Sequence, residues 1–224
     1  MRKIFDLINS NLFYSKLKQS LSESKNLGRP HIITISRETG SGGRTIAHLL
    51  VEKLGAPWKV YHEEILSEIA KKTHLEKELI SEVNEQRLPF IEQIMMDFFG
   101  KKYLNLNAYH KQLTRILSVI GQRGDAIIIG RGASFLLPSS LKVRIICEMN
   151  KRVERLMKLR NLSRNEAIKL INESDKKRSS LIKALYNHDV KKAHHYDLVI
   201  RIDNNLTIED AVEIILAAAK QRFK

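Results

Sequence analysis

The sequence predicts an α/β fold in three layers, in which helices cover both faces of a five-stranded, mainly parallel sheet. Five short apolar runs alternate with longer segments of helical periodicity. The last three runs, AIIIG (126–130), KVRIICE (142–148) and DLVIRI (197–202), are too continuously apolar for half-exposed strands and suit a buried parallel sheet. Ligands of such folds bind beyond the carboxyl ends of the strands, so we expect a site in the loops that follow them.

The N-terminal segment, residues 1–30, is expected to form a helix and a linker before the main domain of residues 31–224. Apolar residues recur at near-helical spacing between positions 4 and 21, and the polar, glycine-ended segment SESKNLGRP follows them. The apolar stripe is modest and Asp6 falls within it. This pattern favours a helix that packs on the domain over a membrane anchor or a transit peptide.

The main domain opens with a strand, a glycine-rich turn and a helix, which is the start of a βαβ unit. The strand is HIITIS (31–36), and the helix ends at Gly55-Ala56-Pro57. Four residues mark the apolar face of this helix: Ile46, Leu49, Leu50 and Leu54. WKVYH (58–62) is a second short strand, and residues 63–122 have a helical character that indicates a helical insertion.

Two further helices are predicted between the last strands, at 150–160 and 163–188. A final helix runs from Thr207 to about Arg222 and begins with the sequence TIED. This is the pattern of a capping box, in which Thr207 and Asp210 exchange hydrogen bonds at the helix N-terminus.

The chain is strongly basic, with 39 Lys and Arg against 25 Asp and Glu and a formal net charge of +14. Such a charge favours phosphorylated small molecules, nucleic acid or an anionic membrane as partners. Basic residues are densest in 151–164 and 175–195, where acidic residues are interspersed, so a solvated helix face and an anion-facing patch both stay open. Aromatic residues seldom interleave with the basic ones, which leaves RNA binding as a minor alternative.

Cys147 is the only cysteine, so the chain cannot form an intramolecular disulfide, and its place in VRIICEM predicts a buried thiol. No apolar stretch approaches the roughly 18 residues that a membrane span needs, and polar breaks near the N-terminus spoil a signal-peptide core. We therefore expect a cytoplasmic protein with no membrane partner, and the sequence leaves a homo-oligomer open.

The stretch ISRETGSGGRT (35–45) has the composition of a phosphate-binding loop. Its glycines let backbone N–H groups turn toward an anion, and the following helix offers its N-terminal N–H groups and dipole. The pattern G-x-x-x-x-G-K-[ST] is not matched, because Arg44 or Gly43 falls at the lysine position and Glu38 or Arg37 at the first glycine. An arginine fork can perform the electrostatic task of that lysine, and an ordinary tight turn is the alternative.

Several segments together resemble the cytidylate kinase-like family of P-loop kinases over about residues 31–220. They are ITISRETGSGGRTIAHLLVEKLG (32–55), VYHEEIL (60–66), AIIIGRGASFLLP (126–138), LKVRIIC (141–147) and YDLVIRIDNNLTIEDAVEII (196–215). The first segment is the most specific, since loops of this family have the form S-R-E-x-G-S-G-G-R. By this resemblance, the missing lysine is a family trait.

The resemblance implies a P-loop kinase fold with a mobile helical lid, here about 150–192, that moves the γ-phosphoryl group of ATP to a nucleoside monophosphate with the help of Mg²⁺. Arg131 aligns with the arginine of the G-R-D motif of cytidylate kinases and would bind the acceptor phosphate. The donor phosphates would be bound by Gly40, Ser41, Gly42, Gly43, Arg44 and Thr45, with the Thr45 hydroxyl on magnesium. The other candidates are Arg37, Arg44, Arg155 and Arg178 for catalysis, Tyr61, Glu64 and Asp175 for the acceptor, and the further lid arginines Arg152 and Arg160.

Three positions depart from the pattern of cytidylate kinases. Ile129 replaces an acidic residue before G-R-D, Gly132 replaces the aspartate of that motif, and His62 stands where many relatives have an aspartate. The carboxylates expected near magnesium or the acceptor are therefore absent from these positions, which leaves the acceptor and the handling of the metal open. An ATP-dependent kinase is the leading hypothesis, and a nucleotide-binding regulatory or scaffolding protein that has lost transfer is the second.

The remaining candidate residues have simpler explanations. His188, His194 and His195 lack the cysteine or carboxylate partners of a recognisable metal site, so we expect solvated side chains. Asp175 and Arg178 have the spacing of an intrahelical ion pair. Tyr61 and Glu64 are equally well explained by core packing and by a surface charge.

Overall fold

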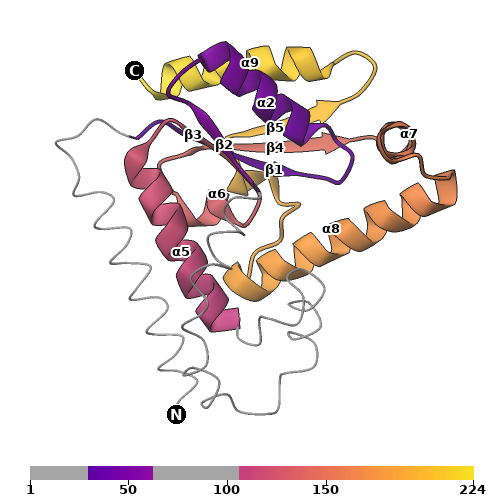
Figure 1. Cartoon of the computed structure of the whole chain (residues 1–224), viewed down its shortest axis with the longest axis horizontal. Helices are drawn as coiled ribbons and strands as arrows, with labels where there is room; N and C mark the ends of the chain where they lie inside the picture. Colours follow the sequence, from indigo (N-terminus) through magenta and orange to yellow (C-terminus); the bar gives the residue numbers. More distant parts are fainter. Residues whose placement is uncertain (1–29, 63–105) are drawn as a thin grey trace, which may run out of the picture.

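The computed structural model of the chain describes residues 30–62 and 106–224 (Figure 1). The helix expected before residue 30 and the part of the insertion between residues 63 and 105 lie outside the described residues, as does Glu64. Within the described ranges, the chain forms an α/β domain around one central sheet.

All five predicted strands are present, and each neighbouring pair is parallel. In chain order the strands are β1 (Ile32–Arg37), β2 (Lys59–Tyr61), β3 (Ala126–Ile129), β4 (Leu141–Cys147) and β5 (Leu198–Ile202). Their order across the sheet is β2-β3-β1-β4-β5, so the chain passes from one side of β1 to the other between β3 and β4. In open α/β sheets, such a change of direction creates a crevice at the carboxyl ends of the central strands.

Helices cover both faces of this sheet (Figure 1). α2 (Gly43–Leu54) and α9 (Ile208–Arg222) pack on one face, whereas α5 (Leu106–Arg123) and the short α6 (Ala133–Leu136) pack on the other. Each face buries its own apolar cluster, to which the strands contribute mostly isoleucine. The three-layer α/β/α arrangement predicted from the sequence is therefore confirmed.

Side chains alternate between the two faces along β1. Ile33 and Ile35 belong to the cluster beneath α2 and α9, whereas Ile32 belongs to the cluster beneath α5 and α6. By the same alternation, Ser36 shares the second face with Ile32, and the parallel register pairs it with Arg144 of β4. Near its carboxyl end, the α5 face of the sheet therefore carries polar and charged side chains.

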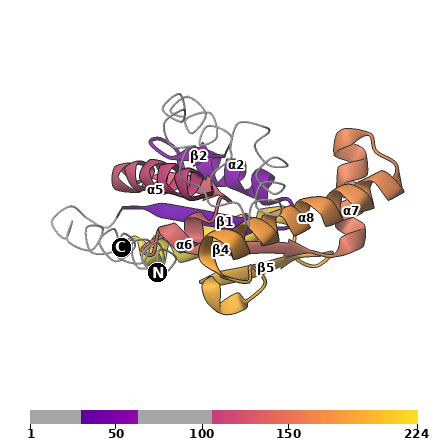
Figure 2. The same ribbon diagram turned by 90° about the horizontal axis from the view of Figure 1, so that it is seen from below.

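The expected lid segment contains two helices joined by a short turn, α7 (Met149–Arg160) and α8 (Arg164–Tyr186). Ser163 and Glu166 form a capping box at the start of α8. The two helices share a small apolar core that consists of Val153, Leu156, Ala167 and Ile171. Seen from below, α7 and the start of α8 lie past one end of the sheet, and the remainder of α8 runs back along it (Figure 2).

The C-terminal segment follows the sequence prediction closely. After the 3-10 turn η3 (Ala193–His195) and strand β5, α9 begins with the predicted capping box, in which Thr207 and Asp210 each bind the backbone N–H of the other. Helix α6 was not predicted, because a single turn of four residues is too short for apolar periodicity to reveal. No helix in the described ranges is both long and apolar enough to cross a membrane.

Candidate functional site

A cavity of about 590 Å³ opens at the carboxyl ends of β1 and β3. Its walls come from the loop between β1 and α2, the turn after β3, and residues of α7 and α8. This is the crevice in which the sheet topology places a ligand. All five arginines proposed for catalysis or for the acceptor line it: Arg37, Arg44, Arg131, Arg155 and Arg178.

The glycine-rich loop forms one wall of the cavity and leads directly into α2. Gly40 and Gly42 have φ angles of 79° and 91°, and Gly42 is the N-cap of the helix. Gly42 offers no side-chain cap, and the first turn of α2 has no acidic residue, so its N-terminal N–H groups and dipole suit an anion. Arg44 and Thr45 are exposed at the start of the helix and line the cavity.

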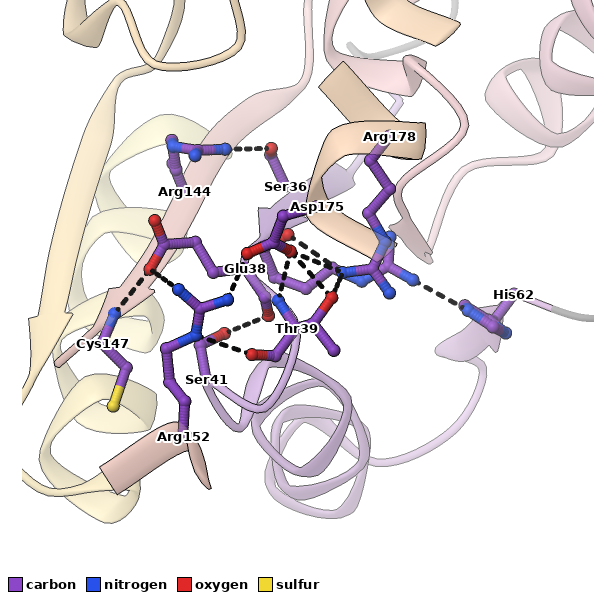
Figure 3. A network of polar contacts seen from close by, with 11 residues as sticks. Ser36, Glu38, Thr39, Ser41, His62, Arg144, Cys147, Arg152, Asp175 and Arg178 are labelled. Atoms are coloured by element: carbon purple, nitrogen blue, oxygen red, sulfur yellow. Dashed lines mark hydrogen bonds and ion pairs between the residues drawn. The ribbon is translucent and has the colours of Figure 1, made fainter. Parts of the chain in front are cut away.

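The rear of this loop is fastened by two carboxylates and one arginine, from three separate elements (Figure 3). Asp175 of α8 accepts hydrogen bonds from the backbone N–H and the hydroxyl of Thr39, at 2.8 and 2.7 Å. Glu38 accepts from the Cys147 N–H at 3.1 Å. Arg152 of α7 contacts both carboxylates and donates to the Thr39 carbonyl at 2.7 Å. Asp175 is therefore more than the intrahelical partner of Arg178.

The front of the loop brings basic side chains together around His62. Arg37 Nη2 lies 2.9 Å from His62 Nε2, and Arg44 Nη2 lies 3.3 Å from His62 Nδ1. Burial and the neighbouring arginines, Arg37 first, lower the pKa of His62 from 6.5 to about 4, so the imidazole is neutral at pH 7. A neutral imidazole accepts a hydrogen bond through one nitrogen only. Because the contact with Arg37 is the shorter one, Nε2 is the nitrogen that accepts, from Arg37.

Arg37 lies at the centre of this basic group. Its pKa is lowered well below the usual value, by burial first and then by Arg178, Arg131 and Arg44. The carboxylate of Asp175 acts in the opposite direction and raises the pKa of Arg37. Positive charges held this close are stabilised by an anion between them, and several negative oxygens on one ligand would serve best.

The turn after β3, Gly130-Arg131-Gly132, has three successive left-handed residues, with φ of 73°, 56° and 69°. At Gly130, a Cβ would lie 2.0 Å from Arg37 Nη1, so only glycine leaves room for that guanidinium. At Gly132, a Cβ would lie 2.2 Å from a ring carbon of Tyr186. Tyr186 thus fills the space that the aspartate of a G-R-D motif would need.

Arg131 adopts this left-handed backbone without being glycine, at a cost on the order of 1–3 kcal/mol. Strain of this kind concentrates at functional sites, where the surrounding structure holds it in place. Here it places Arg131 in the wall of the cavity, among the arginines that lower the pKa of Arg37.

The helices of the lid segment bring the predicted arginines Arg155 and Arg178 to the glycine-rich loop, and Arg160 of α7 also lines the cavity. Arg155 of α7 donates to the Gly40 carbonyl. Arg178 of α8 donates to the Thr39 hydroxyl at 2.9 Å and reaches the Arg37 carbonyl at 3.5 Å. Burial is the main cause that lowers the pKa of Arg178. Both arginines therefore contact the glycine-rich loop and line the same cavity.

Several of the proposed residues lie away from the cavity wall. Ser41 is buried, and its hydroxyl donates to the Glu38 carbonyl at 2.9 Å. Tyr61, at the end of β2, packs against the apolar cluster of α5 and α6. Asp175 holds the loop from the rear. The Thr45 hydroxyl remains the candidate magnesium ligand, and the described residues contain no group of three or more His, Cys, Asp or Glu arranged for a metal ion.

The three histidines near the end of α8 lie in a ring cluster on the outside of the domain. His188 and His194 are exposed, as expected for solvated side chains, whereas His195 is partly buried with its Nε2 unpartnered. Phe135 of α6 stacks on His188, with ring centroids 4.9 Å apart.

Cys147, which the sequence predicts as a buried thiol, is 7% exposed in the structure.

The sequence reasoning missed a second polar group in the cavity, formed by Ser36, Arg144 and Tyr196. Arg144 Nη1 donates to the Ser36 hydroxyl at 3.0 Å, and its guanidinium lies 5.7 Å from the centroid of the Tyr196 ring. The signal was present in the sequence. Arg144 is a charged residue in the middle of the apolar run VRIIC, a place where a strand of a buried sheet ordinarily has an apolar residue.

The chain is similar to known cytidylate kinases. Residues 32–204 match the model of the cytidylate kinase-like family. The chain is 28% identical to a cytidylate kinase of Methanothrix thermoacetophila over 189 residues, which cover 83% of this chain and 98% of the relative. A cytidylate kinase of Methanopyrus kandleri is also 28% identical, over 199 residues that cover 84% of this chain and 92% of that protein.

A solved structure also has a similar fold. An uncharacterized protein from Eubacterium ventriosum superimposes with a TM-score of 0.64 at 20% sequence identity, and the match covers 85% of this chain and 98% of that one. At this identity the likeness concerns the fold alone. Because the family model matches well over half of the sequence, the chain belongs to the cytidylate kinase-like family.

Proposed function

We propose that this protein is an ATP-dependent phosphotransferase that moves the γ-phosphoryl group of ATP to a nucleotide such as CMP, or to another small phosphorylated acceptor. The observation that carries the proposal is the convergence of a glycine-rich loop, a helix N-terminus and several arginines on one cavity. Phosphoryl transfer requires mainly positioning and positive charge, and this cavity offers both. The cytidylate kinases to which the chain is similar support the choice of acceptor class.

Each part of the cavity has a role in the proposed reaction. The backbone N–H groups of residues 40–45 bind the donor phosphates, and Arg44 provides the charge that a lysine provides in the common motif. Arg131 holds the acceptor phosphate. An oxygen of that phosphate attacks the γ-phosphorus, the bond from the γ-phosphorus to the β,γ-bridging oxygen breaks, and ADP leaves. Arg155 and Arg178, which reach the loop from α7 and α8, stabilise the charge of the transferring group.

Magnesium fits one described residue in this scheme. The Thr45 hydroxyl lines the cavity at the start of α2, the position from which a P-loop threonine binds Mg²⁺. When bound, the metal supplies charge neutralisation on the β- and γ-phosphates. His62 stays neutral and accepts from Arg37, so it orients that guanidinium without adding a further charge.

The proposal is tested by ADP release over a panel of nucleoside and sugar monophosphates, measured with a coupled assay. We expect ADP release that depends on the acceptor, and a loss of about a thousandfold for Arg44→Ala and for Arg131→Ala. Arg123→Ala is the matched control, since Arg123 is exposed in the last turn of α5 and lies outside the cavity wall. Full activity in the double variant of Arg44 and Arg131 would refute the proposed site.

One observation favours a second candidate, a nucleotide-binding regulatory protein that no longer transfers the phosphoryl group. Among the described residues that line the cavity, Glu38 is the only one with a carboxylate, and the Cys147 N–H and Arg152 already engage it. ATP binding without turnover for any acceptor in the panel, together with slow hydrolysis that Arg44→Ala leaves unchanged, would select this candidate.

A further inference from the structure

Arg144 is a buried cation in the wall of the cavity. It lies in the middle of β4, its parallel register partner on β1 is Ser36, and it is only 5% exposed. Ser36 and Arg37 are successive residues of β1, so their side chains leave opposite faces of the sheet. Arg144, which shares its face with Ser36, is therefore built into a part of the cavity separate from the arginines around His62.

The charge of Arg144 has no carboxylate partner among the described residues. Its polar contacts are a hydrogen bond to the Ser36 hydroxyl and the face of the Tyr196 ring. The hydrogen bond to Ser36 uses one of the five N–H groups of the guanidinium. The Tyr196 ring makes a cation–π contact, which does not neutralise the positive charge. Burying a cation without an anion is costly, so such a residue is expected to have a use.

Arg152 is a second buried arginine, and its partners offer a comparison with Arg144. It is 7% exposed, almost the same as Arg144. Arg152, however, contacts the carboxylates of Glu38 and Asp175 and donates to the Thr39 carbonyl. The two arginines differ in the anion: carboxylates of the protein contact Arg152, whereas no carboxylate of the described residues pairs with Arg144.

The surroundings of Arg144 are held in place before any ligand binds. Tyr196 is 9% exposed, and its hydroxyl donates to the Val190 carbonyl at 2.9 Å. The same hydroxyl lies 3.3 Å from the Ser36 Oγ, which also accepts from Arg144. Ser36, Arg144 and Tyr196 thus form a connected polar group with a fixed geometry, as a binding point for a specific ligand group requires.

We propose that Arg144 binds a second anionic group of the acceptor, apart from the phosphate that receives the γ-phosphoryl group. The inference rests on the proposed function and adds to it that, among the acceptors of that reaction, molecules with a second anionic group bind more tightly. A guanidinium fork suits an oxyanion that presents two oxygens, which a carboxylate and a phosphate both do. A cavity of about 590 Å³ is large enough for such a molecule.

The test compares matched ligands by isothermal titration calorimetry at constant ionic strength. Cytidine 3′,5′-bisphosphate against cytidine 5′-monophosphate probes a second phosphate, and 3-phosphoglycerate against glycerol 3-phosphate probes a carboxylate. In the wild type we expect the doubly anionic member of at least one pair to bind about ten- to hundredfold more tightly. The pair that shows this preference identifies the anion as a phosphate or a carboxylate.

Three variants assign the preference to Arg144. Arg144→Gln should bring the ratio of the two dissociation constants close to one, Arg144→Lys should keep part of the preference, and Arg123→Gln should match the wild type. Thermal denaturation and the dissociation constant for ATP report whether each variant keeps its fold and its loop. A ratio near one for both pairs in the wild type overturns the proposal, even if a variant does not fold.

A wild-type preference that Arg144→Gln leaves intact overturns it as well, because Arg144 would then have a structural role only. Since binding is measured rather than turnover, the result does not depend on whether the protein transfers a phosphoryl group. A failure of the proposal for Arg144 can therefore be distinguished from a failure of the proposed function.

Discussion

The two sides of the glycine-rich loop differ in how their charges are paired. At the rear, Arg152 lies against Glu38 and Asp175, and these groups hold Thr39 and the end of β4 (Figure 3). At the front, arginines lie near one another and near a neutral histidine, and burial first and then the neighbouring arginines lower the pKa of Arg37. The rear is an ion-pair network, whereas at the front we expect a ligand with negative charge to add stability.

This difference separates the charges that stabilise the fold from those that serve a ligand. Removing a charged side chain at the rear leaves its partners unpaired in the folded protein, so we expect the free energy of unfolding to fall. Removing an arginine at the front relieves repulsion in the protein without ligand. We therefore expect phosphoryl transfer to fall while the free energy of unfolding is kept. Variants of Arg37, Arg152 and His62 test this division.

The largest expected effect concerns Arg37 at the front. In Arg37→Met we expect phosphoryl transfer to fall by about a thousandfold, as for other arginines that contact a transferring group. The free energy of unfolding without ligand should stay the same or rise by about 1 kcal/mol, because a buried and repelled cation is removed. Steady-state kinetics and urea denaturation measure the two effects, with Arg123→Met as the control. If Arg37→Met lowered the free energy of unfolding and kept its activity, Arg37 would stabilise the fold rather than serve a ligand.

The next effect concerns Arg152 at the rear. In Arg152→Met the carboxylates of Glu38 and Asp175 lose their shared cation, and we expect the free energy of unfolding to fall by about 3 kcal/mol. The control is Arg164→Met, which removes an exposed arginine from the start of α8. Unchanged stability in urea denaturation would show that the rear network does not hold the loop.

The smallest effect is the titration of His62. Its pKa is 6.5 ordinarily and about 4 in the folded protein, so the unfolded chain takes up the proton first as the pH falls. The neutral imidazole therefore contributes stability above about pH 6.5, which is lost as the pH falls toward 4. Because His62 is partly exposed, screening by solvent should limit the loss in the free energy of unfolding to about 1 kcal/mol.

Unfolding free energies of the wild type and of His62→Asn, measured between about pH 4 and pH 7, isolate this contribution from the carboxylates that titrate in the same range. The wild type should lose more stability than the variant on acidification. Parallel pH profiles would contradict the low pKa of His62 and with it the concentration of positive charge at the front.

The sheet and the lid segment could be predicted because their signals are local. The isoleucine-rich runs around Ile33 and Ile128 gave the strands, and the patterns at Ser163 and Thr207 mark helix starts through neighbours three residues away. Members of the basic group, such as Arg44 and Arg131, could be named from the family pattern. Their convergence with His62 follows from the order of the strands, which the sequence does not display.

The rear network and the contacts of Arg144 depend on residues that lie far apart in the sequence. Asp175 and Thr39 are 136 positions apart, and their contact depends on how α8 packs against the loop. Glu38 occupies a glycine position of the common motif, yet its partner Cys147 lies at the end of another strand. Arg144 was visible as a charge in an apolar run, but its burial and its contact with Ser36 required the sheet register.

The transfer of phosphorus itself tests the central claim most directly. In a ³¹P NMR experiment with ATP, Mg²⁺, CMP and the wild-type protein, the γ-phosphorus of ATP should disappear as a new nucleoside diphosphate signal grows from CMP. Retention of all ATP signals in the presence of every acceptor of the panel, or conversion of ATP to ADP and inorganic phosphate alone, would contradict the account.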